Sequence, residues 1–173
     1  MWKFFSDESL NLCELIPIFI SFFTPGWRVK TIYYAFAITV LLILMNVTKL
    51  LYADPRPYWV NPDIIVGSCS RNYGNPSGHS STVMGMSLVM WLDYCQSYSN
   101  RNKCLFLIPA ILIPLTTGYS RLILGVHSLD QILYGLLLGV WVAFSMHYYV
   151  SSFIHRYAHS ILGYKHDATT DSI

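Results

Sequence analysis

The stretch TIYYAFAITVLLILMNVTKLLYADPRP occupies residues 31–57, and its first part, Thr31–Thr48, carries no charged residue. An apolar segment of about 17–25 residues is long enough to cross the hydrocarbon core of a bilayer as a helix. The apolar character extends past Lys49 to Ala53. Two prolines then flank Arg56 and must end the helix, because proline donates no backbone hydrogen bond. We therefore predict a transmembrane helix that ends with two cations at the membrane rim.

Three further apolar segments follow: Ser80–Leu92 with its continuation to Cys95, Cys104–Tyr119, and Gln131–Ile154. An earlier segment, Leu10–Pro25, contains Glu14, so the sequence leaves it open between a short span, a re-entrant piece and an interfacial helix. We expect an all-α, polytopic transmembrane bundle with four clear spans plus this N-terminal segment. In the last span, Gly135 and Gly139 have the spacing that allows close helix approach.

The composition agrees with a membrane protein. Of 173 residues, 54% are hydrophobic and 12% are charged, whereas soluble domains carry about 25% charged residues. The net charge of +2 and the lack of a basic run give no reason to expect nucleic acid as a partner. The four cysteines form no CxxC pair, so we expect neither a metal site nor a disulfide framework. We expect one membrane domain over 1–173, with a motif-bearing core at 31–154 and a polar tail at 155–173.

The distribution of Lys and Arg predicts the orientation in the membrane, because basic residues favour the cytoplasmic side. Alternating spans place six of them on the side of the C-terminus: Arg28, Lys30, Arg101, Lys103, Arg156 and Lys165. If the N-terminal segment spans, the other side holds Lys3 and Arg71 besides the cations discussed next. The loops 54–78 and 120–128 are therefore expected at the lumen or exterior, and the C-terminus in the cytoplasm or its equivalent.

Three cations lie at the ends of apolar segments: Lys49, Arg56 and Arg121. The long stem of Lys49 lets its ammonium group reach the water at the rim, and an arginine offers a planar fork to phosphate oxygens. Taken alone, such residues are more often interfacial anchors that fix the depth of a helix. Between them, Pro76-Ser77-Gly78-His79 precedes an apolar run. Such a helix entry can seat an anion on free N–H groups, although alone it is also an ordinary helix start.

The third cluster adds His127 and Asp130 to Ser120-Arg121. At the start of a helix, residues three apart share a face, so Asp130 could orient one ring nitrogen of His127 and leave the other as a nucleophile. An ordinary membrane protein has no reason to bring all three clusters to the same face of the bilayer. Together they indicate a site that binds a phosphate group and breaks its ester bond.

The spacing of the three clusters resembles that of the type 2 phosphatidic acid phosphatase superfamily, which includes glucose-6-phosphatases and vanadium haloperoxidases. The matching residues are Lys49, Arg56-Pro57, Pro76-Ser77-Gly78-His79, Ser120-Arg121 and His127. The resemblance implies a membrane phosphatase for a lipid phosphate or isoprenyl diphosphate monoester that uses no metal and no cofactor.

The resemblance also implies a role for each residue. His127 would attack phosphorus to form a phosphohistidine, and His79 would protonate the leaving oxygen. Lys49, Arg56, Arg121, Ser77 and Gly78 would bind the phosphate oxygens. The chain departs from the family pattern in two ways: Gln131 stands where the family has its last Asp, with Asp130 one residue early, and fewer spans precede the first motif. The sequence therefore leaves open whether Asp130 or Gln131 orients the His127 ring, and a neutral Gln131 would stabilise the imidazolium less.

The reduced N-terminal part motivates an alternative from another class of protein. In that interpretation the chain is a structural or lipid-holding subunit of a larger membrane assembly. A channel or transporter is less well supported, because Glu14 and His147 are the only ionisable residues well inside a span.

Overall fold

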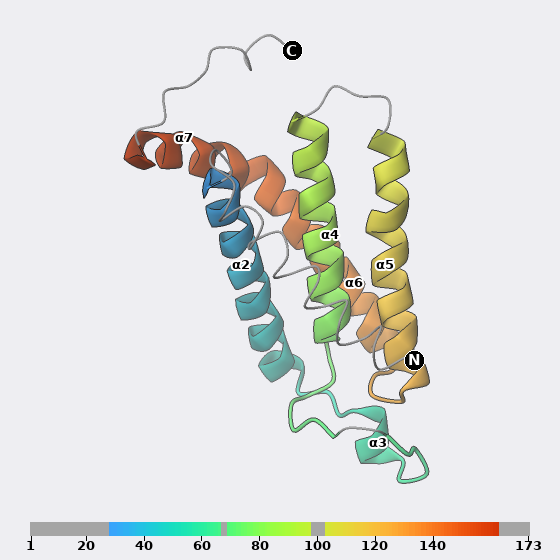
Figure 1. Ribbon diagram of the computed structural model, residues 1–173. Coiled ribbons are helices and arrows are strands. Elements are labelled where there is room, and N and C mark those ends of the chain that lie inside the picture. Colours follow the sequence, from blue (N-terminus) through green and yellow to red (C-terminus); the bar gives the residue numbers. More distant parts are fainter. Residues whose placement is uncertain (1–27, 67–68, 98–102, 163–173) are drawn as a thin grey trace.

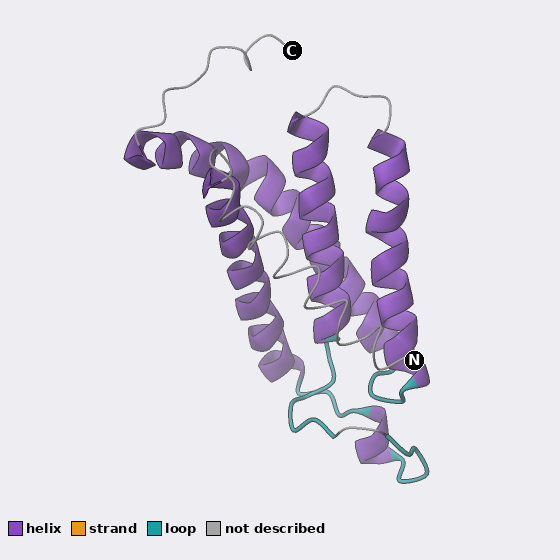
Figure 2. Ribbon diagram, in the orientation of Figure 1, coloured by secondary structure: helices purple, strands orange, loops and turns teal. Residues whose placement is uncertain are grey.

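The computed structural model describes residues 28–66, 69–97 and 103–162. The segment Leu10–Pro25, whose path the sequence leaves open, lies outside these residues. The described part of the chain consists of helices and loops (Figure 2). In chain order the helices are α2 (Arg28–Tyr52), α3 (Pro57–Val60), α4 (Gly78–Ser97), α5 (Lys103–Ile123), α6 (Leu129–Ser145), the π-helix η1 (Met146–Val150) and α7 (Ser151–Leu162).

Three helical stretches are long and apolar enough to cross a membrane: Val29–Val60, Lys103–Ile123 and Leu129–Ile154. They agree with the apolar segments that the sequence indicates at 31–53, 104–119 and 131–154. The remaining segment, predicted from Ser80 onward, forms α4, a helix of 20 residues that is less apolar than the others. The all-α membrane bundle is confirmed, and the count of four spans is approximate.

The lower apolarity of α4 follows from its central position in the bundle. It packs against α2, α5 and α6 (Figure 1), and 12 of its 20 residues are buried. Two of its small polar side chains are satisfied within the helix: the hydroxyls of Ser81 and Thr82 both donate to the carbonyl oxygen of Gly78, each at 2.9 Å. A helix surrounded by other helices needs little of the apolar surface that lipid contact demands.

Close contact between α4 and α6 depends on glycine. A Cβ atom at Gly139 would lie 2.6 Å from the carbonyl oxygen of Ser81 and 2.8 Å from the backbone nitrogen of Gly85. A Cβ atom at Gly135 would lie 2.6 Å from the carbonyl oxygen of Ser77. The glycine spacing seen in the sequence therefore marks a helix contact in which the two backbones approach directly.

One end of the bundle gathers the segments that carry the three sequence clusters. The last turns of α2 and α5 and the first turns of α4 and α6 lie at this end, with α3 in the loop between α2 and α4 (Figure 1). At Ala53 the chain leaves α2 with a φ of +45°, a backbone conformation that residues other than glycine rarely adopt. We call this the motif end.

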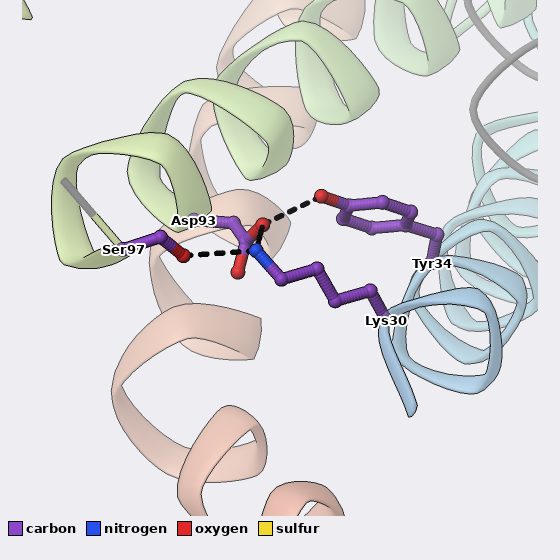
Figure 3. A network of polar contacts seen from close by, with 4 residues as sticks. All are labelled: Lys30, Tyr34, Asp93 and Ser97. Atoms are coloured by element: carbon purple, nitrogen blue, oxygen red, sulfur yellow. Dashed lines mark hydrogen bonds and ion pairs between the residues drawn. The ribbon is translucent and has the colours of Figure 1, made fainter. Parts of the chain in front are cut away.

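The opposite end is held together by a polar cluster between α2 and α4 (Figure 3). Lys30 Nζ lies 2.8 Å from Asp93 Oδ2 and donates to Ser97 Oγ at 2.8 Å, and the Tyr34 hydroxyl donates to Asp93 Oδ2 at 2.7 Å. Asp93 is buried, so these two donors satisfy a carboxylate that would otherwise be costly there. The cluster fixes the start of α2 against the end of α4.

Candidate active site

A cavity of about 310 Å³ opens at the motif end of the bundle. Six of the residues that the sequence proposes for the site line it: Lys49, Arg56, Gly78, His79, Arg121 and His127. The cavity continues along α2 past two apolar side chains, Met45 and Leu42. Its wall is therefore cationic at the membrane rim and apolar toward the span.

The three cations reach this cavity from three different segments. Lys49 comes from the last turn of α2, Arg56 from the residue before α3, and Arg121 from the last turn of α5. Their exposed fractions are only 8%, 4% and 8%. None of the described residues that line the cavity is acidic. Buried positive charge without a lining carboxylate makes the cavity a strong site for an anion.

Arg56 is fixed by its own hydrogen bonds. Its Nε donates to the carbonyl oxygen of Asn72 at 2.7 Å, and its Nη1 donates to the carbonyl oxygen of Val126 at 3.2 Å. The same Nη1 lies 3.3 Å from Nε2 of His127. The guanidinium group thus holds together the loops of the first and third clusters and stands directly beside the imidazole ring.

His127 is buried, with 3% of its surface exposed, and lies in the short loop between α5 and α6. Burial, and then the positive charge of Arg56, lowers the pKa of His127 to about 3, with smaller contributions from Arg121 and Lys49. The hydrogen bond with Gln131 opposes this shift. At neutral pH the imidazole is therefore uncharged, which is the state that a nucleophilic nitrogen requires.

Gln131, and not Asp130, contacts the His127 ring. Gln131 Oε1 lies 3.1 Å from His127 Nδ1, and Gln131 is buried, whereas Asp130 is exposed in the first turn of α6. The expectation that Asp130 orients His127 is corrected by this geometry. The reason is local: His127 precedes the N-cap residue Ser128, so the side chain at the third helical position turns back over the ring while the second points outward.

The motif around the start of α4 divides between the cavity and the helix contact. His79 and Gly78 line the cavity, and a Cβ atom at Gly78 would lie 2.8 Å from the sulfur of Met45. Ser77 does not line the cavity: it is fully buried, its backbone N–H donates to the carbonyl oxygen of Gln131 at 2.9 Å, and its hydroxyl accepts from Ser80. In this structure Ser77 joins α4 to α6, and its role in binding phosphate stays a prediction.

Sequence reasoning missed the residues that shape the loop between α2 and α4. The Tyr58 hydroxyl donates to the carbonyl oxygen of Ser70 at 2.9 Å and accepts from the Ser70 backbone N–H at 2.8 Å. Ser70 and Asn72 then line the cavity. Asp54 contacts the Gln131 side chain at 2.9 Å. The signal in the sequence is weak, because Asp54 differs from other polar loop residues only in lying two positions before Arg56.

Comparisons with known proteins agree with this arrangement. A family model described as the PAP2 superfamily matches residues 30–154. The chain is 27% identical over 149 residues to dolichyldiphosphatase of Saccharomyces cerevisiae, covering 82% of this chain and 62% of the relative. It is 30% identical over 106 residues to undecaprenyl-diphosphatase of Sulfolobus acidocaldarius, covering 61% of this chain and 48% of the relative. The chain thus spans about half to two thirds of the length of these curated relatives.

A solved structure shares the fold. The transmembrane PAP2-type phosphatidylglycerolphosphate phosphatase from Bacillus subtilis superposes with a TM-score of 0.67 at 21% sequence identity, covering 92% of this chain and 74% of that protein. With three helices able to cross a bilayer, the chain is an integral membrane protein. Since the family model covers most of the sequence, including all three clusters, the chain belongs to the PAP2 superfamily.

Proposed function

We propose that the protein is an integral-membrane phosphatase that hydrolyses a lipid phosphate or isoprenyl diphosphate monoester through a phosphohistidine intermediate. The observation that carries the proposal is the neutral, buried imidazole of His127 beside the guanidinium of Arg56, in a cavity that three cations line. A nucleophile next to fixed positive charge suits attack on an anionic phosphorus centre.

The proposed reaction has two steps. His127 Nε2 attacks phosphorus, and the bond between phosphorus and the leaving oxygen breaks while His79 gives its proton to that oxygen. His79 then takes a proton from water, and the resulting hydroxide attacks phosphorus. The bond between phosphorus and His127 Nε2 breaks, which releases inorganic phosphate and restores the free imidazole. Three cations, Lys49, Arg56 and Arg121, stabilise the charge on the equatorial oxygens of the transition state. In this mechanism the side chains neutralise that charge, and no metal or cofactor is needed.

The cavity favours a lipid substrate. Its cationic part lies at the rim of the bundle, and Met45 and Leu42 continue it along α2 toward the apolar span. A phosphate group bound at the cations would leave its hydrocarbon chain beside these residues. Because two curated relatives are named for polyprenyl diphosphates, we put isoprenyl diphosphates first among the substrates to test.

The test measures phosphate release by the purified protein in detergent, with polyprenyl diphosphate, phosphatidate and glucose 6-phosphate as substrates. We expect release from at least one lipid substrate, and His127→Ala abolishes it. His147→Ala is the matched control, because His147 lies in η1 and does not line the cavity. Undiminished release by His127→Ala would refute the proposed nucleophile.

We also propose that the motif end faces the lumen or exterior. Two exposed cysteines can report on this: Cys69 lies in the loop before α4, and Cys104 at the opposite end of the bundle, in the first turn of α5. In variants that retain one of them, a membrane-impermeant maleimide applied to the lumenal or exterior side of a sealed membrane should label Cys69 and leave Cys104 unmodified. Labelling of Cys104 alone would reverse the proposed orientation.

A further inference from the structure

The side-chain amide of Gln131 has every hydrogen-bonding position filled. Its Nε2 donates to Asp54 Oδ2 and to the carbonyl oxygen of Pro55, both at 2.9 Å. Its Oε1 lies 3.1 Å from His127 Nδ1 and accepts from the Ser128 backbone N–H at 3.4 Å. An amide has two donor hydrogens and two acceptor lone pairs, so these four contacts use all of them.

These contacts determine which way the amide faces. A carboxylate and a carbonyl can only accept, so the amide nitrogen must face Asp54 and Pro55. The amide oxygen then faces the His127 ring, and Nδ1 must carry the proton that it donates. The other nitrogen, Nε2, keeps its lone pair, and it is this atom that lies 3.3 Å from Arg56 Nη1. The network thus selects the tautomer that an attacking Nε2 needs.

Gly74 holds the amide from a further side. A Cβ atom at this position would lie 2.5 Å from both Nε2 and Oε1 of Gln131, and the Gly74 backbone N–H donates to the carbonyl oxygen of Asp54 at 2.8 Å. The loop that supplies Asp54 is therefore tied to the backbone that packs against the amide. This close packing restricts the Gln131 amide to one position, and it is an observation independent of the hydrogen bonds.

We propose that Asp54 is a positioning residue for the reaction, whose carboxylate acts on His127 through the Gln131 amide. The inference rests on the proposed function. The carboxylate holds and polarises the amide, which increases the negative charge on Oε1. That oxygen then stabilises the positive charge that develops on the ring as Nε2 bonds to phosphorus. The sequence suggested that Asp130 supplies this carboxylate. In the proposed arrangement Asp54 supplies it from another segment, and the Gln131 amide lies between the carboxylate and the ring.

The test compares the turnover of Asp54→Ala and Asp54→Asn with that of the wild-type protein. Asp54→Ala should lower kcat about 10-fold to 100-fold, the usual effect of losing an outer partner of a functional histidine. KM and inhibition by inorganic phosphate should change less than about twofold, because the cations that bind phosphate are untouched. Asp54→Asn can still accept from the amide but carries no charge, so its kcat should lie between the two. Asp63→Ala is the matched control, an exposed acid in the same loop.

The relay also predicts that the two residues act as a unit. Gln131→Ala should lower kcat at least as much as Asp54→Ala, and the double variant should be no slower than Gln131→Ala alone. Gly74→Ala should lower kcat as well, since its Cβ displaces the amide. Additive losses in the double variant, or an unchanged kcat in Asp54→Ala, would overturn the relay.

A readout that needs no substrate separates the relay from the proposed function. Nitrogen NMR of histidine-labelled protein, with the His127 signals assigned by their loss in His127→Ala, should show a protonated Nδ1 and a bare Nε2 at neutral pH. Asp54→Ala should give a mixture of tautomers, and Asp63→Ala should not. A wild-type protein inactive on every phosphate ester would refute the function while this spectrum still tested the relay. A single unaltered tautomer in Asp54→Ala would refute the relay alone.

Discussion

At the scale of single residues, the surroundings of His127 keep the imidazole uncharged, the state that the proposed nucleophile needs, in a group that ordinarily titrates near neutrality. Burial and the neighbouring cations disfavour its protonated form, and the contact with Gln131 only partly compensates. The cations proposed to bind the phosphate group therefore also keep the ring uncharged. In the proposed mechanism, a phosphate group in the cavity offsets the charge of these cations and lets the ring become positive during attack.

The lowered pKa of His127 has a consequence for stability. The folded pKa of about 3 lies below the ordinary value of 6.5, so folding excludes a proton that the unfolded chain binds. The contribution of His127 to the free energy of unfolding is therefore fully present above pH 6.5 and is lost as the pH falls toward 3. We expect a loss of roughly 1 kcal/mol per pH unit between pH 6 and pH 4.

Thermal unfolding in detergent checks this expectation. The His127→Asn variant removes the titrating group, so its unfolding temperature should fall less than that of the wild-type protein between pH 7 and pH 4. Parallel pH profiles for the two proteins would mean that folding does not lower the pKa of His127.

Arg56 has a shape requirement as well as a charge requirement. Its guanidinium group contacts Asn72, Val126 and His127 at once, and the single ammonium group of a lysine cannot reproduce that geometry. We expect Arg56→Lys to lower kcat/KM about 100-fold, the effect of removing one well-placed donor to a transition-state oxygen. Arg71→Lys, at an exposed position of the same loop, is the control that should leave kcat/KM unchanged.

The sequence predicts most of the residues that line the cavity. It does not predict which side chain contacts the His127 ring, because the geometry of the helix N-terminus determines that contact. Lys49, Arg56, His79, Arg121 and His127 could be proposed from residue type and spacing alone. From residue type alone, Asp130 is the better candidate to orient His127, because a carboxylate stabilises an imidazolium better than an amide does. The position of the helix N-terminus nevertheless brings Gln131, and not Asp130, to the ring. Asp54 could not be found in this way, because its contact joins residues 77 positions apart.

At the scale of helices, the contact between α4 and α6 keeps the second and third clusters together. Ser77, the residue before α4, is joined to the first turn of α6 by the bond from its N–H to the Gln131 carbonyl oxygen. The glycines of α6 let the two helices stay close farther from the site. The sequence indicated the spacing of these glycines, but the partner helix and the polar character of α4 become clear only from the packing.

We therefore expect Gly139→Ala to destabilise the fold. Its Cβ would meet backbone atoms of Ser81 and Gly85, which cannot rotate away, so α6 must shift outward. A cost of about 2 kcal/mol is usual for such overpacking, and it should appear as a lower thermal inactivation temperature in detergent. Leu137→Ala, at an exposed position of α6, is the control. Equal inactivation temperatures for the two variants would show that the helices do not require the close approach.

At the scale of the whole molecule, the two ends of the bundle have different tasks. The motif end collects positive charge around a cavity, and the opposite end contains the ion pair of Lys30 with Asp93. Both ends involve α2 and α4. Because α2 is a continuous helix from Arg28 to Tyr52, an attachment at its start also limits how far Lys49 can slide relative to His79. The ion pair is thus placed to maintain the alignment of the site from a distance.

This arrangement predicts an asymmetry among variants of the ion pair. Lys30→Met removes the ammonium group from the buried Asp93 carboxylate and leaves the hydrogen bond from Tyr34 in place. It should cost about 2 kcal/mol, less than breaking a fully buried pair, because Lys30 is partly exposed. The double variant Lys30→Met with Asp93→Leu removes both charges and should be more stable than Lys30→Met alone. Thermal inactivation in detergent measures both effects, and KM for the lipid substrate should rise in the single variant if α2 slides. A double variant that is less stable than Lys30→Met would show instead that the carboxylate stabilises the bundle through Tyr34 without needing the lysine.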